Sequence, residues 1–237
     1  MVMERKYLAF DIETAKILPE NAGNLMAHRP LGVSCAAVWP SDRDESVVFY
    51  SLKADKRPAV KMSRKDLSKM VDFLLKSQKE GYTILSHNGL GFDFDILAEE
   101  SGRTEDCKKL ALSHVDMMFH FFCEKGFGVS LNAAAKAIGQ SKAEGMEGSI
   151  APKLWKEGKH QKVLDYVSQD CQLTLDIAER AESSGSFQWI TQRGKKAYLS
   201  IPSGWLSVSE AQKLPLPDTS WMDNPWKRSR FDSWLNQ

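Results

Sequence analysis

The stretch YLAFDIET, residues 7–14, has the pattern of a strand that opens the protein. Large apolar side chains fill positions 8, 10 and 12, and successive side chains of a strand point to opposite faces. Asp11 and Glu13 therefore share the other face, where two carboxylates repel each other unless a cation lies between them. This spacing suits a hard divalent ion, which takes oxygen ligands. For this motif alone, an exposed acidic strand end is the simpler interpretation.

The residues that follow alternate between strands and helices. Residues 33–39 and 47–52 are typical of two further strands, which with the first would form an antiparallel meander. A helix is predicted to begin at Ser63, because Asp66 three residues later resembles a capping box. A buried strand at residues 82–85 comes next. We therefore predict an α/β fold.

A second motif, HNGLGFD, occupies residues 87–93. It predicts a glycine-rich turn after the buried strand and a helix over residues 92–100. Asp93 lies in line with core-facing residues three and four positions later, whereas Asp95 lies nearer the solvent side. A buried carboxylate is costly unless a cation is near it. Asp93 is therefore the candidate for chemistry, and Asp95 is expected to be solvated or to cap the helix.

Residues 104–125 are predicted to be helical and become strongly apolar towards their end. His114, Asp116 and His120 lie in this segment at a spacing that could suggest a metal site. Hydrogen bonding at the edge of the core is the interpretation we favour for them.

A short helix and a long connection are predicted next. Ser130 is expected to cap a helix over residues 131–138. Residues 139–158 are expected to form a polar connection, a type of segment that is often mobile and beside a site. Whether it closes over a substrate is left open.

The third motif lies on a predicted helix over residues 160–182. Tyr166 and Asp170 are four residues apart and so lie on one face of this helix. Their direction falls within its apolar stripe, which makes Asp170 an inward-facing carboxylate that needs a partner. A cation shared with the other three candidate carboxylates would supply that partner.

Together the three motifs resemble those of a DEDD-superfamily 3′–5′ exonuclease of the tyrosine subclass. The chain is similar over about residues 6–182 to the proofreading exonuclease domain of family-B DNA polymerases. FDIET at 10–14 matches the first motif, residues 88–93 the second and residues 166–170 the third. The histidine variant of the third motif would carry His where this chain has Asp165.

The resemblance implies a ribonuclease H-like fold, a mixed sheet flanked by helices. We assign residues 1–184 to this domain and residues 185–237 to a Trp-rich, basic and irregular extension packed on it. The resemblance also implies two divalent metal ions, Mg²⁺ or Mn²⁺, that lie about 4 Å apart and clamp the attacking and leaving oxygens.

The resemblance further implies a role for each site residue. Asp11 would bridge both ions, Glu13 and Asp170 would complete the shell of one, and Asp93 would help to hold the other. Tyr166 would orient the attacking water, because an unperturbed tyrosine, with a pKa near 10, is a poor general base. Substrate contacts are expected from Thr14, Asn88 and Phe92.

The expected activity is removal of 5′-mononucleotides from the 3′ end of single-stranded nucleic acid, with DNA favoured over RNA. No polymerase portion is seen, so the protein is expected to act alone or with a replication or repair protein. Two alternatives remain: an enzyme of the same fold that trims RNA 3′ ends, and a nuclease-like module that binds nucleic acid or a partner without cutting it.

Composition sets broader limits. The 237 residues carry a formal net charge of +1, which neither favours nor excludes a nucleic-acid partner. The four cysteines form no CxxC pair, so buried thiols in a reducing compartment are expected rather than disulfides or a zinc site. Without an apolar signal segment or a run long enough to cross a bilayer, a cytoplasmic protein is expected.

The extension could play either of two parts. It holds five of the seven tryptophans, with basic residues among them. Such a pattern can stack bases and follow a phosphate backbone. We favour the alternative, in which the indoles pack against the core. The tryptophans are Trp189, Trp205, Trp221, Trp226 and Trp234.

Overall fold

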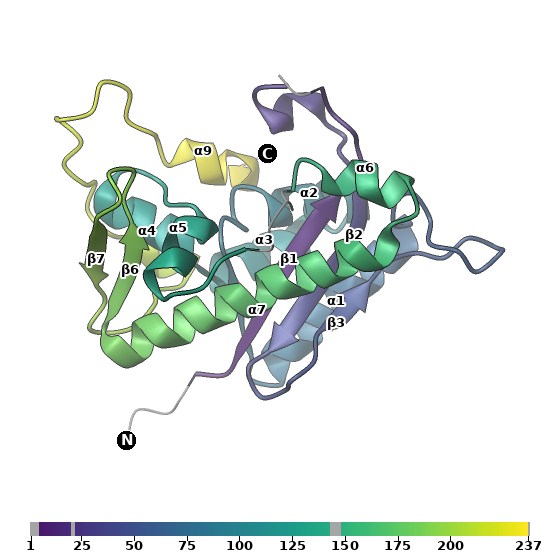
Figure 1. Ribbon diagram of the computed structural model, residues 1–237, viewed down its shortest axis with the longest axis horizontal. Helices are drawn as coiled ribbons and strands as arrows, with labels where there is room; N and C mark the ends of the chain where they lie inside the picture. The colour runs from purple at the N-terminus through teal and green to yellow at the C-terminus, as the bar shows by residue number, and fades with distance from the viewer. Residues whose placement is uncertain (1–4, 20–21, 143–147, 237) are drawn as a thin grey trace.

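The computed structural model describes residues 5–19, 22–142 and 148–236. Its main sheet has five strands in the order β3-β2-β1-β4-β5, and a separate hairpin pairs β6 with β7 (Figure 1). The strands are β1 (Tyr7–Thr14), β2 (Val33–Pro40), β3 (Val47–Phe49), β4 (Thr83–Ser86), β5 (Val115–Asp116), β6 (Ser186–Ile190) and β7 (Lys196–Ser200).

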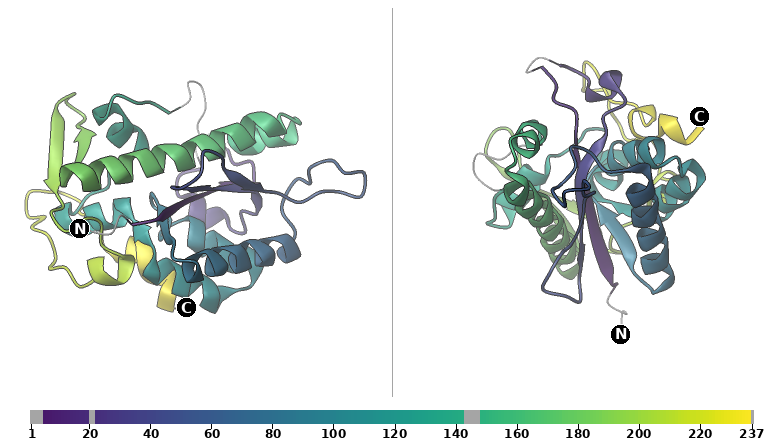
Figure 2. Two further views of the ribbon diagram at one scale, coloured as in Figure 1. Left: turned by 90° about the horizontal axis from the view of Figure 1, so that it is seen from below. Right: turned by 90° about the vertical axis from the view of Figure 1, so that its right-hand side faces the viewer.

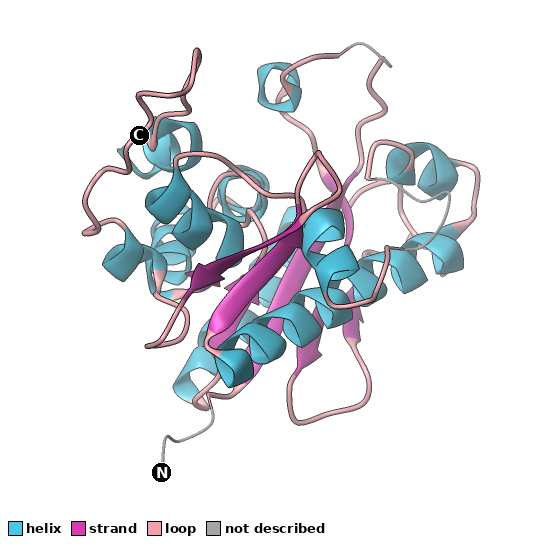
Figure 3. Ribbon diagram, turned by 60° about the vertical axis from the view of Figure 1, so that its left-hand side comes forward, coloured by secondary structure: helices cyan, strands magenta, loops and turns pink. Residues whose placement is uncertain are grey.

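Helices surround this sheet. They are α1 (Arg64–Lys79), α2 (Asp93–Ser101), α3 (Thr104–Ser113), α4 (Met117–Lys125), α5 (Leu131–Ala137), α6 (Ala151–Lys156), α7 (His160–Ser184), α8 (Val208–Ala211) and α9 (Ser229–Asp232). Two short 3₁₀ helices are η1 (Leu25–His28) and η2 (Ser233–Asn236). Figure 3 shows the strands enclosed by these helices.

The sheet is mixed. Strands β1 and β2 are antiparallel, as are β2 and β3, whereas β1, β4 and β5 run parallel. The predicted meander and the predicted ribonuclease H-like fold, a mixed sheet with flanking helices, are therefore confirmed. Strand β1 lies at the centre of the sheet, so its side chains reach the packed layers on both faces.

Alternation along β1 divides the core into two layers. Leu8, Phe10 and Ile12 pack with residues of α1, α2 and α3 on one face. Tyr7 and Ala9 pack with residues of α7 on the other. The end-on view in Figure 2 shows α7 on one side of the sheet and α1 on the other. The period of two predicted for this strand is confirmed, and it directs Asp11 and Glu13 towards the α7 layer.

The predicted helix caps are also confirmed. The Ser63 hydroxyl accepts a hydrogen bond from the Asp66 N–H at 3.1 Å, and Ser130 caps α5 in the same way through Ala133. Gly102 ends α2 with φ 68°, in the left-handed region that favours glycine.

The prediction of one helix over residues 104–125 is wrong. The chain leaves α3 at His114, whose backbone is extended, and β5 pairs with β4 before α4 begins. Asp116 is the N-cap of α4, because its Oδ1 accepts from the N–H groups of Met118 and Phe119 at 3.0 and 3.1 Å. The favoured interpretation of His114 holds, since its ring bonds to Ser86 and to the Ala111 carbonyl inside the core.

The predicted connection over residues 139–158 is not a simple loop. It contains α6, and Trp155 on this helix is buried, with its Nε1 donating to the Ala59 carbonyl at 2.8 Å. Residues 143–147 lie outside the described part of the chain.

Several residues after α7 pack back against the two layers of the core. Trp189, Trp205 and Trp234 are buried, whereas Trp221 is 67% exposed and Trp226 lies at the surface. The Trp234 Nε1 donates to the Leu90 carbonyl at 2.8 Å, so the end of the chain packs beside the second motif.

No helix among the described residues is both long enough and apolar enough to span a bilayer.

Candidate active site

The structure brings the four predicted carboxylates together from three elements. Asp11 and Glu13 come from β1, Asp93 from the first turn of α2 and Asp170 from the middle of α7. Burial raises the pKa of Asp11 well above its usual range, and repulsion from Asp93, Asp170 and Glu13 raises it further.

Each of the other three carboxyl groups is perturbed in the same direction. Burial, with repulsion from Asp170, raises the pKa of Glu13 to about 8. Burial raises that of Asp93 to about 7, although an N–H donor on Ile12 opposes the shift. Burial also raises the pKa of Asp170. Glu13, Asp93 and Asp170 are at most 5% exposed, while Asp11 is half-buried and gives the cluster a side open to solvent.

Small, weakly polar residues surround the cluster. On β2, Ala37 and Cys35 lie opposite Asp11 and Glu13. On α7, the Cys171 thiol lies 3.3 Å from the Ala37 carbonyl. Burial, followed by repulsion from Asp11, raises the pKa of Cys171, so the thiol stays neutral. These groups offer the carboxylates almost no hydrogen bonds. The repulsion among the four carboxylates is therefore not offset by neighbouring polar groups, and a cation between them would be favoured.

All four cysteines are buried free thiols, as predicted.

Asp93 is held in place by backbone groups. Its Oδ1 accepts a hydrogen bond from the Ile12 N–H at 3.0 Å, which joins α2 to β1 between the two acidic residues of the first motif. Its position at the N-terminus of α2 also favours a negative charge. The inward direction predicted for Asp93 is therefore confirmed.

The prediction that Asp95 is solvated or caps the helix is wrong. Both of its carboxylate oxygens accept from Arg29, at 2.7 and 2.8 Å, and Arg29 Nε donates to Glu99 at 2.8 Å. This bidentate pair fastens the loop before β2 to α2, and it separates Asp95 from the carboxylate cluster.

The second motif is shaped by Asp116, which the sequence placed only at the edge of the core. Its two carboxylate oxygens accept from the backbone N–H groups of Asn88 and Leu90, at 2.8 and 2.9 Å. Asn88 has φ 80°, a conformation that asparagine tolerates better than most residues. A Cβ on Gly89 would overlap the Ser86 hydroxyl, so only glycine fits there.

The three residues predicted to contact substrate lie at the ends of these elements. Thr14 is the last residue of β1 and is buried. Asn88 lies in the turn, and Phe92 is the partly exposed N-cap residue of α2. Phe92 packs against the neighbouring core. The contact of these three residues with substrate stays a prediction.

Tyr166 and Asp170 lie on the buried face of α7, as the helical period predicts. Burial, followed by repulsion from Asp170, raises the pKa of Tyr166, and a hydrogen bond to Asp170 acts in the same direction. The phenol therefore stays protonated across the neutral range, where it can donate or accept a hydrogen bond but not serve as a base.

Lys142 joins this cluster, and sequence reasoning missed it. Its Nζ lies 2.5 Å from Asp170 Oδ2 and 5.1 Å from the centre of the Tyr166 ring. Lys142 lowers the pKa values of Asp11 and Glu13, partly offsetting their burial. It lies in the polar connection, which has no sequence period to indicate the direction of a side chain.

His87 was also given no role from the sequence. Its Nε2 hydrogen-bonds to the Val129 carbonyl at 2.8 Å, and its buried Nδ1 has no partner among the described residues. Burial lowers the pKa of His87, so the ring stays neutral and Nδ1 remains an acceptor.

The cluster fits divalent cations by its chemistry. It offers only carboxylate oxygens, which suit Mg²⁺ or Mn²⁺. Asp170 Oδ1 is buried and has no hydrogen-bond partner among the described residues. In the described residues no three such side chains are already arranged to hold a metal ion, and the Lys142 ammonium contacts Asp170 instead. Binding a metal would require these side chains to rearrange.

Without metal, the protein is expected to lose stability as pH rises from about 5 to about 8. Carboxyl groups of an unfolded chain titrate near pH 4, whereas those of Asp93 and Glu13 titrate near 7 and 8 in the folded protein. The folded state then binds more protons than the unfolded state, so its free energy of unfolding falls with rising pH. Thermal melting in EDTA at several pH values measures this.

Asp93→Asn should flatten that decline, because asparagine keeps an oxygen for the Ile12 N–H and carries no charge. Mn²⁺ should stabilise the wild-type protein more at pH 8 than at pH 5. Equal slopes for the wild type and the variant would contradict this account of the cluster.

Lys142→Met is expected to lower the free energy of unfolding without metal by about 1–3 kcal/mol at pH 8. The substitution removes the cation that contacts Asp170 and keeps a side chain of similar length. Saturating Mn²⁺ should restore most of the loss, because a bound ion neutralises the same carboxylates. Urea denaturation with and without Mn²⁺ measures both effects. Lys136→Met, at an exposed position on α5, is the control, and an identical loss with and without Mn²⁺ would refute the prediction.

The fold and the buried acidic cluster define a protein of the ribonuclease H-like class. A family model of the RNase H superfamily matches residues 8–182, which include all three motifs. The chain therefore belongs to the RNase H superfamily. Comparison with curated proteins found no match.

One similar solved structure is the family B DNA polymerase from the hyperthermophilic archaeon Pyrobaculum calidifontis. The TM-score is 0.53, with 21% sequence identity over 75% of this chain. This chain spans 24% of that polymerase. The likeness confirms the expected resemblance at the level of the fold, and family and fold together favour a nuclease.

Proposed function

We propose that the protein is a metal-dependent 3′–5′ exonuclease of the tyrosine subclass that shortens single-stranded DNA. One observation carries the proposal: four carboxylates from β1, α2 and α7 meet in a buried cluster that raises their pKa values. A protein that only bound nucleic acid would gain nothing from this repulsion. The family to which the chain belongs supports the same conclusion.

Two Mg²⁺ or Mn²⁺ ions would occupy the cluster. Asp11 would contribute to both ions, Glu13 and Asp170 to one, and Asp93 to the other. When bound, the ions would supply Lewis-acid stabilisation of the reacting phosphate and activation of the attacking water. The orphaned Asp170 Oδ1 supports this assignment.

The chain's own residues would position the reactants. The protonated Tyr166 would hold the attacking water by a hydrogen bond, because its raised pKa keeps the phenol protonated and so unable to act as a base. Lys142 lies close enough to Asp170 to stabilise negative charge in the cluster or at the reacting phosphate. Thr14, Asn88 and Phe92 would contact the terminal nucleotide. The products would be 5′-mononucleotides.

RNA is the second candidate substrate, because a fold does not fix the substrate. Oligonucleotides of one sequence, made as DNA and as RNA, separate the two. We expect both to be shortened in Mn²⁺, with a higher kcat/KM for DNA. A higher kcat/KM for RNA would assign the protein to RNA trimming. Binding of both without cleavage would identify a non-cutting module, whose partner could be a replication or repair protein.

A further inference from the structure

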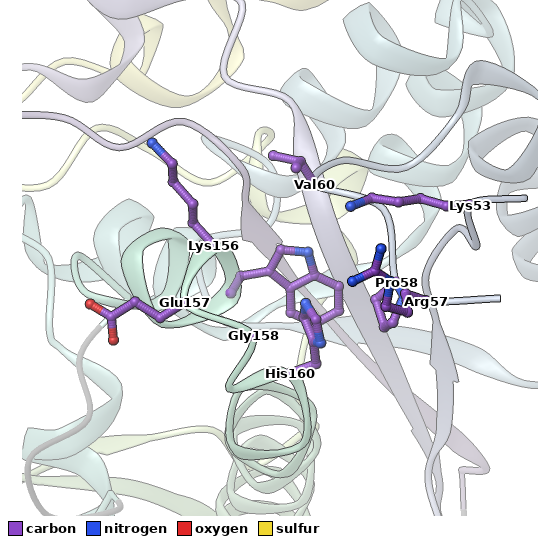
Figure 4. A pocket seen from close by; sticks show the side chains of 9 residues that line it. Lys53, Arg57, Pro58, Val60, Lys156, Glu157, Gly158 and His160 are labelled. Atoms are coloured by element: carbon purple, nitrogen blue, oxygen red, sulfur yellow. The ribbon is translucent and has the colours of Figure 1, made fainter. Parts of the chain in front are cut away.

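A basic cavity of about 410 Å³ lies where the 52–58 loop meets the N-terminus of α7, and no site carboxylate lines it. Its lining includes the cationic residues Lys53, Arg57 and Lys156 as well as His160. These four residues are called the basic pocket below. Figure 4 shows the side chains of Lys53, Arg57 and His160 close to one another on one side of the pocket. The His160 ring meets the Trp155 ring edge to face, with the ring centres 4.7 Å apart.

The two parts of the sequence that supply the cations of the pocket are both rich in positive charge. Residues 52–65 contain six Lys or Arg and one acidic residue. Residues 151–162 contain four Lys and one acidic residue. The whole chain carries a net charge of only +1. The hydrogen bond from Trp155 to the Ala59 carbonyl holds the two segments together. Such a local surplus is the electrostatic signature of a polyanion site.

The cations of the pocket are largely available to a ligand. Lys53 and Lys156 are exposed and have no ion-pair partner among the described residues, and Arg57 pairs only with the exposed Asp55. In Figure 4 the side chain of Glu157 extends away from Lys53, Arg57 and His160. Its carboxylate pairs with Lys159 at 2.8 Å. A phosphate group would therefore meet little competition from acidic side chains.

The pocket is suited to phosphate rather than to bases. Trp155 is 2% exposed and its Nε1 is already bonded, so its ring cannot stack on a base. Lys and Arg bind phosphate oxygens through charge-assisted hydrogen bonds. The positive end of the 25-residue helix α7, which has no acidic residue in its first turn, adds to the same field.

The pocket lies a short distance along α7 from the carboxylate cluster. Tyr166 lies six positions and Asp170 ten positions after His160 on α7, which corresponds to about 9 and 15 Å along a helix. On the other side, Gly148 lies beside Glu13, and α6 follows and ends at Lys156. At about 3.4 Å per nucleotide of a stacked strand, these lengths correspond to roughly three to four nucleotides.

We propose that the basic pocket binds backbone phosphates of the strand whose 3′ end enters the carboxylate cluster, about three to four nucleotides from that end. This inference rests on the proposed exonuclease function. It predicts a contact needed by long substrates and not by the shortest ones.

The test compares two triple variants with equal charge changes. The first is Lys53→Glu, Arg57→Glu and Lys156→Glu. The control is Arg193→Glu, Lys195→Glu and Lys196→Glu, at exposed positions on the β6–β7 hairpin, which lies at the other end of the molecule (Figure 1). Fluorescence anisotropy in EDTA gives the Kd of a fluorescein-labelled 12-nucleotide DNA at several salt concentrations. Cleavage in Mn²⁺ gives kcat and KM for that DNA and for a trinucleotide.

The pocket variant should raise the Kd at least about 10-fold and reduce the slope of log Kd against log salt by about 2, for three lost phosphate contacts. Its KM for the 12-nucleotide DNA should rise, with kcat and trinucleotide cleavage unchanged. The hairpin variant should bind like the wild type. An RNA of the same length should lose the same factor, because the backbone phosphates are shared.

Equal weakening by both triple variants, or by neither, would overturn the inference. Melting curves check folding, and Lys53→Gln with Lys156→Gln replaces the pocket variant if it does not fold. If the wild type cleaves DNA and the pocket variant has the same KM as the wild type, the phosphate site is refuted and the exonuclease function stands. Binding through the pocket with no cleavage in Mn²⁺ would defeat the exonuclease function and leave the phosphate site standing.

Discussion

Asp11→Asn is expected to reduce metal-dependent cleavage at least about 1,000-fold while making the metal-free protein more stable. The loss follows from the proposed position of Asp11 between both ions, since metal stabilisation of a transition state is worth several kcal/mol and each 1.36 kcal/mol is a factor of ten. The gain in stability follows because asparagine removes a charge that Asp93, Asp170 and Glu13 repel. Even about 1 kcal/mol of relieved repulsion would raise Tm by about 2–4 °C.

A substitution that lowers activity and raises stability identifies a functional carboxylate, whereas loss of a structural carboxylate would lower stability. Cleavage rates in Mn²⁺ and melting in EDTA at pH 8 measure the two effects. Asp165→Asn is the matched control, because Asp165 is exposed on the same helix as Asp170 and bonds only to Gln161 among the described residues. We expect the control to change stability by no more than about 0.5 kcal/mol and activity hardly at all. A less stable Asp11→Asn would show that the carboxylate supports the fold instead.

Trp205→Ala is expected to lower the free energy of unfolding by about 3–5 kcal/mol, a large part of the total for an ordinary domain. Trp205 is 1% exposed, and its Nε1 donates to the Ala178 carbonyl at 3.2 Å. Its backbone N–H donates to Glu182 at 3.0 Å, and the Tyr7 hydroxyl donates to the same oxygen at 2.8 Å. Trp205 thus joins the extension to α7 and to the start of β1.

Trp221→Ala is the matched control, because Trp221 is 67% exposed and its ring meets only Phe127 among the described aromatic rings. It should cost no more than about 0.5 kcal/mol. Urea denaturation of both variants, with the denaturant slope checked for a single transition, gives the comparison. Similar costs for the two tryptophans would mean that residues after α7 do not belong to the same cooperative unit.

Local periodicity is why much of the fold and the cluster could be predicted. The alternation in β1 placed Asp11 and Glu13 on one face, and the helical stripe of α7 placed Asp170 inward; the burial of Glu13 and Asp170 agrees with both. A side chain's direction within a regular element depends on the element's own period. The sequence therefore contained this information without any knowledge of tertiary contacts.

Features set by tertiary contacts were not predictable. Strand β5 is two residues long and forms because it pairs with β4. The sequence around it is apolar and has no turn signal, so the break between α3 and α4 could not be predicted. Lys142 reaches Asp170 from a segment without a period. Arg29 and Asp95 lie 66 residues apart and form a pair that composition does not reveal.

The basic pocket was hidden for a related reason. Its cations come from segments about a hundred residues apart, and a net charge of +1 conceals their concentration. Only the fold places the two segments against each other.

The most direct test of the central claim is a time course with a 5′-labelled single-stranded DNA, comparing Mn²⁺, Mg²⁺ and EDTA for the wild type and Asp11→Asn. The proposed site predicts a ladder of labelled fragments that shortens one nucleotide at a time in either metal, with none in EDTA or with the variant. Immediate release of a labelled mononucleotide, cleavage of circular single-stranded DNA, or an unchanged ladder with Asp11→Asn would contradict the assignment of a 3′–5′ exonuclease to this carboxylate cluster.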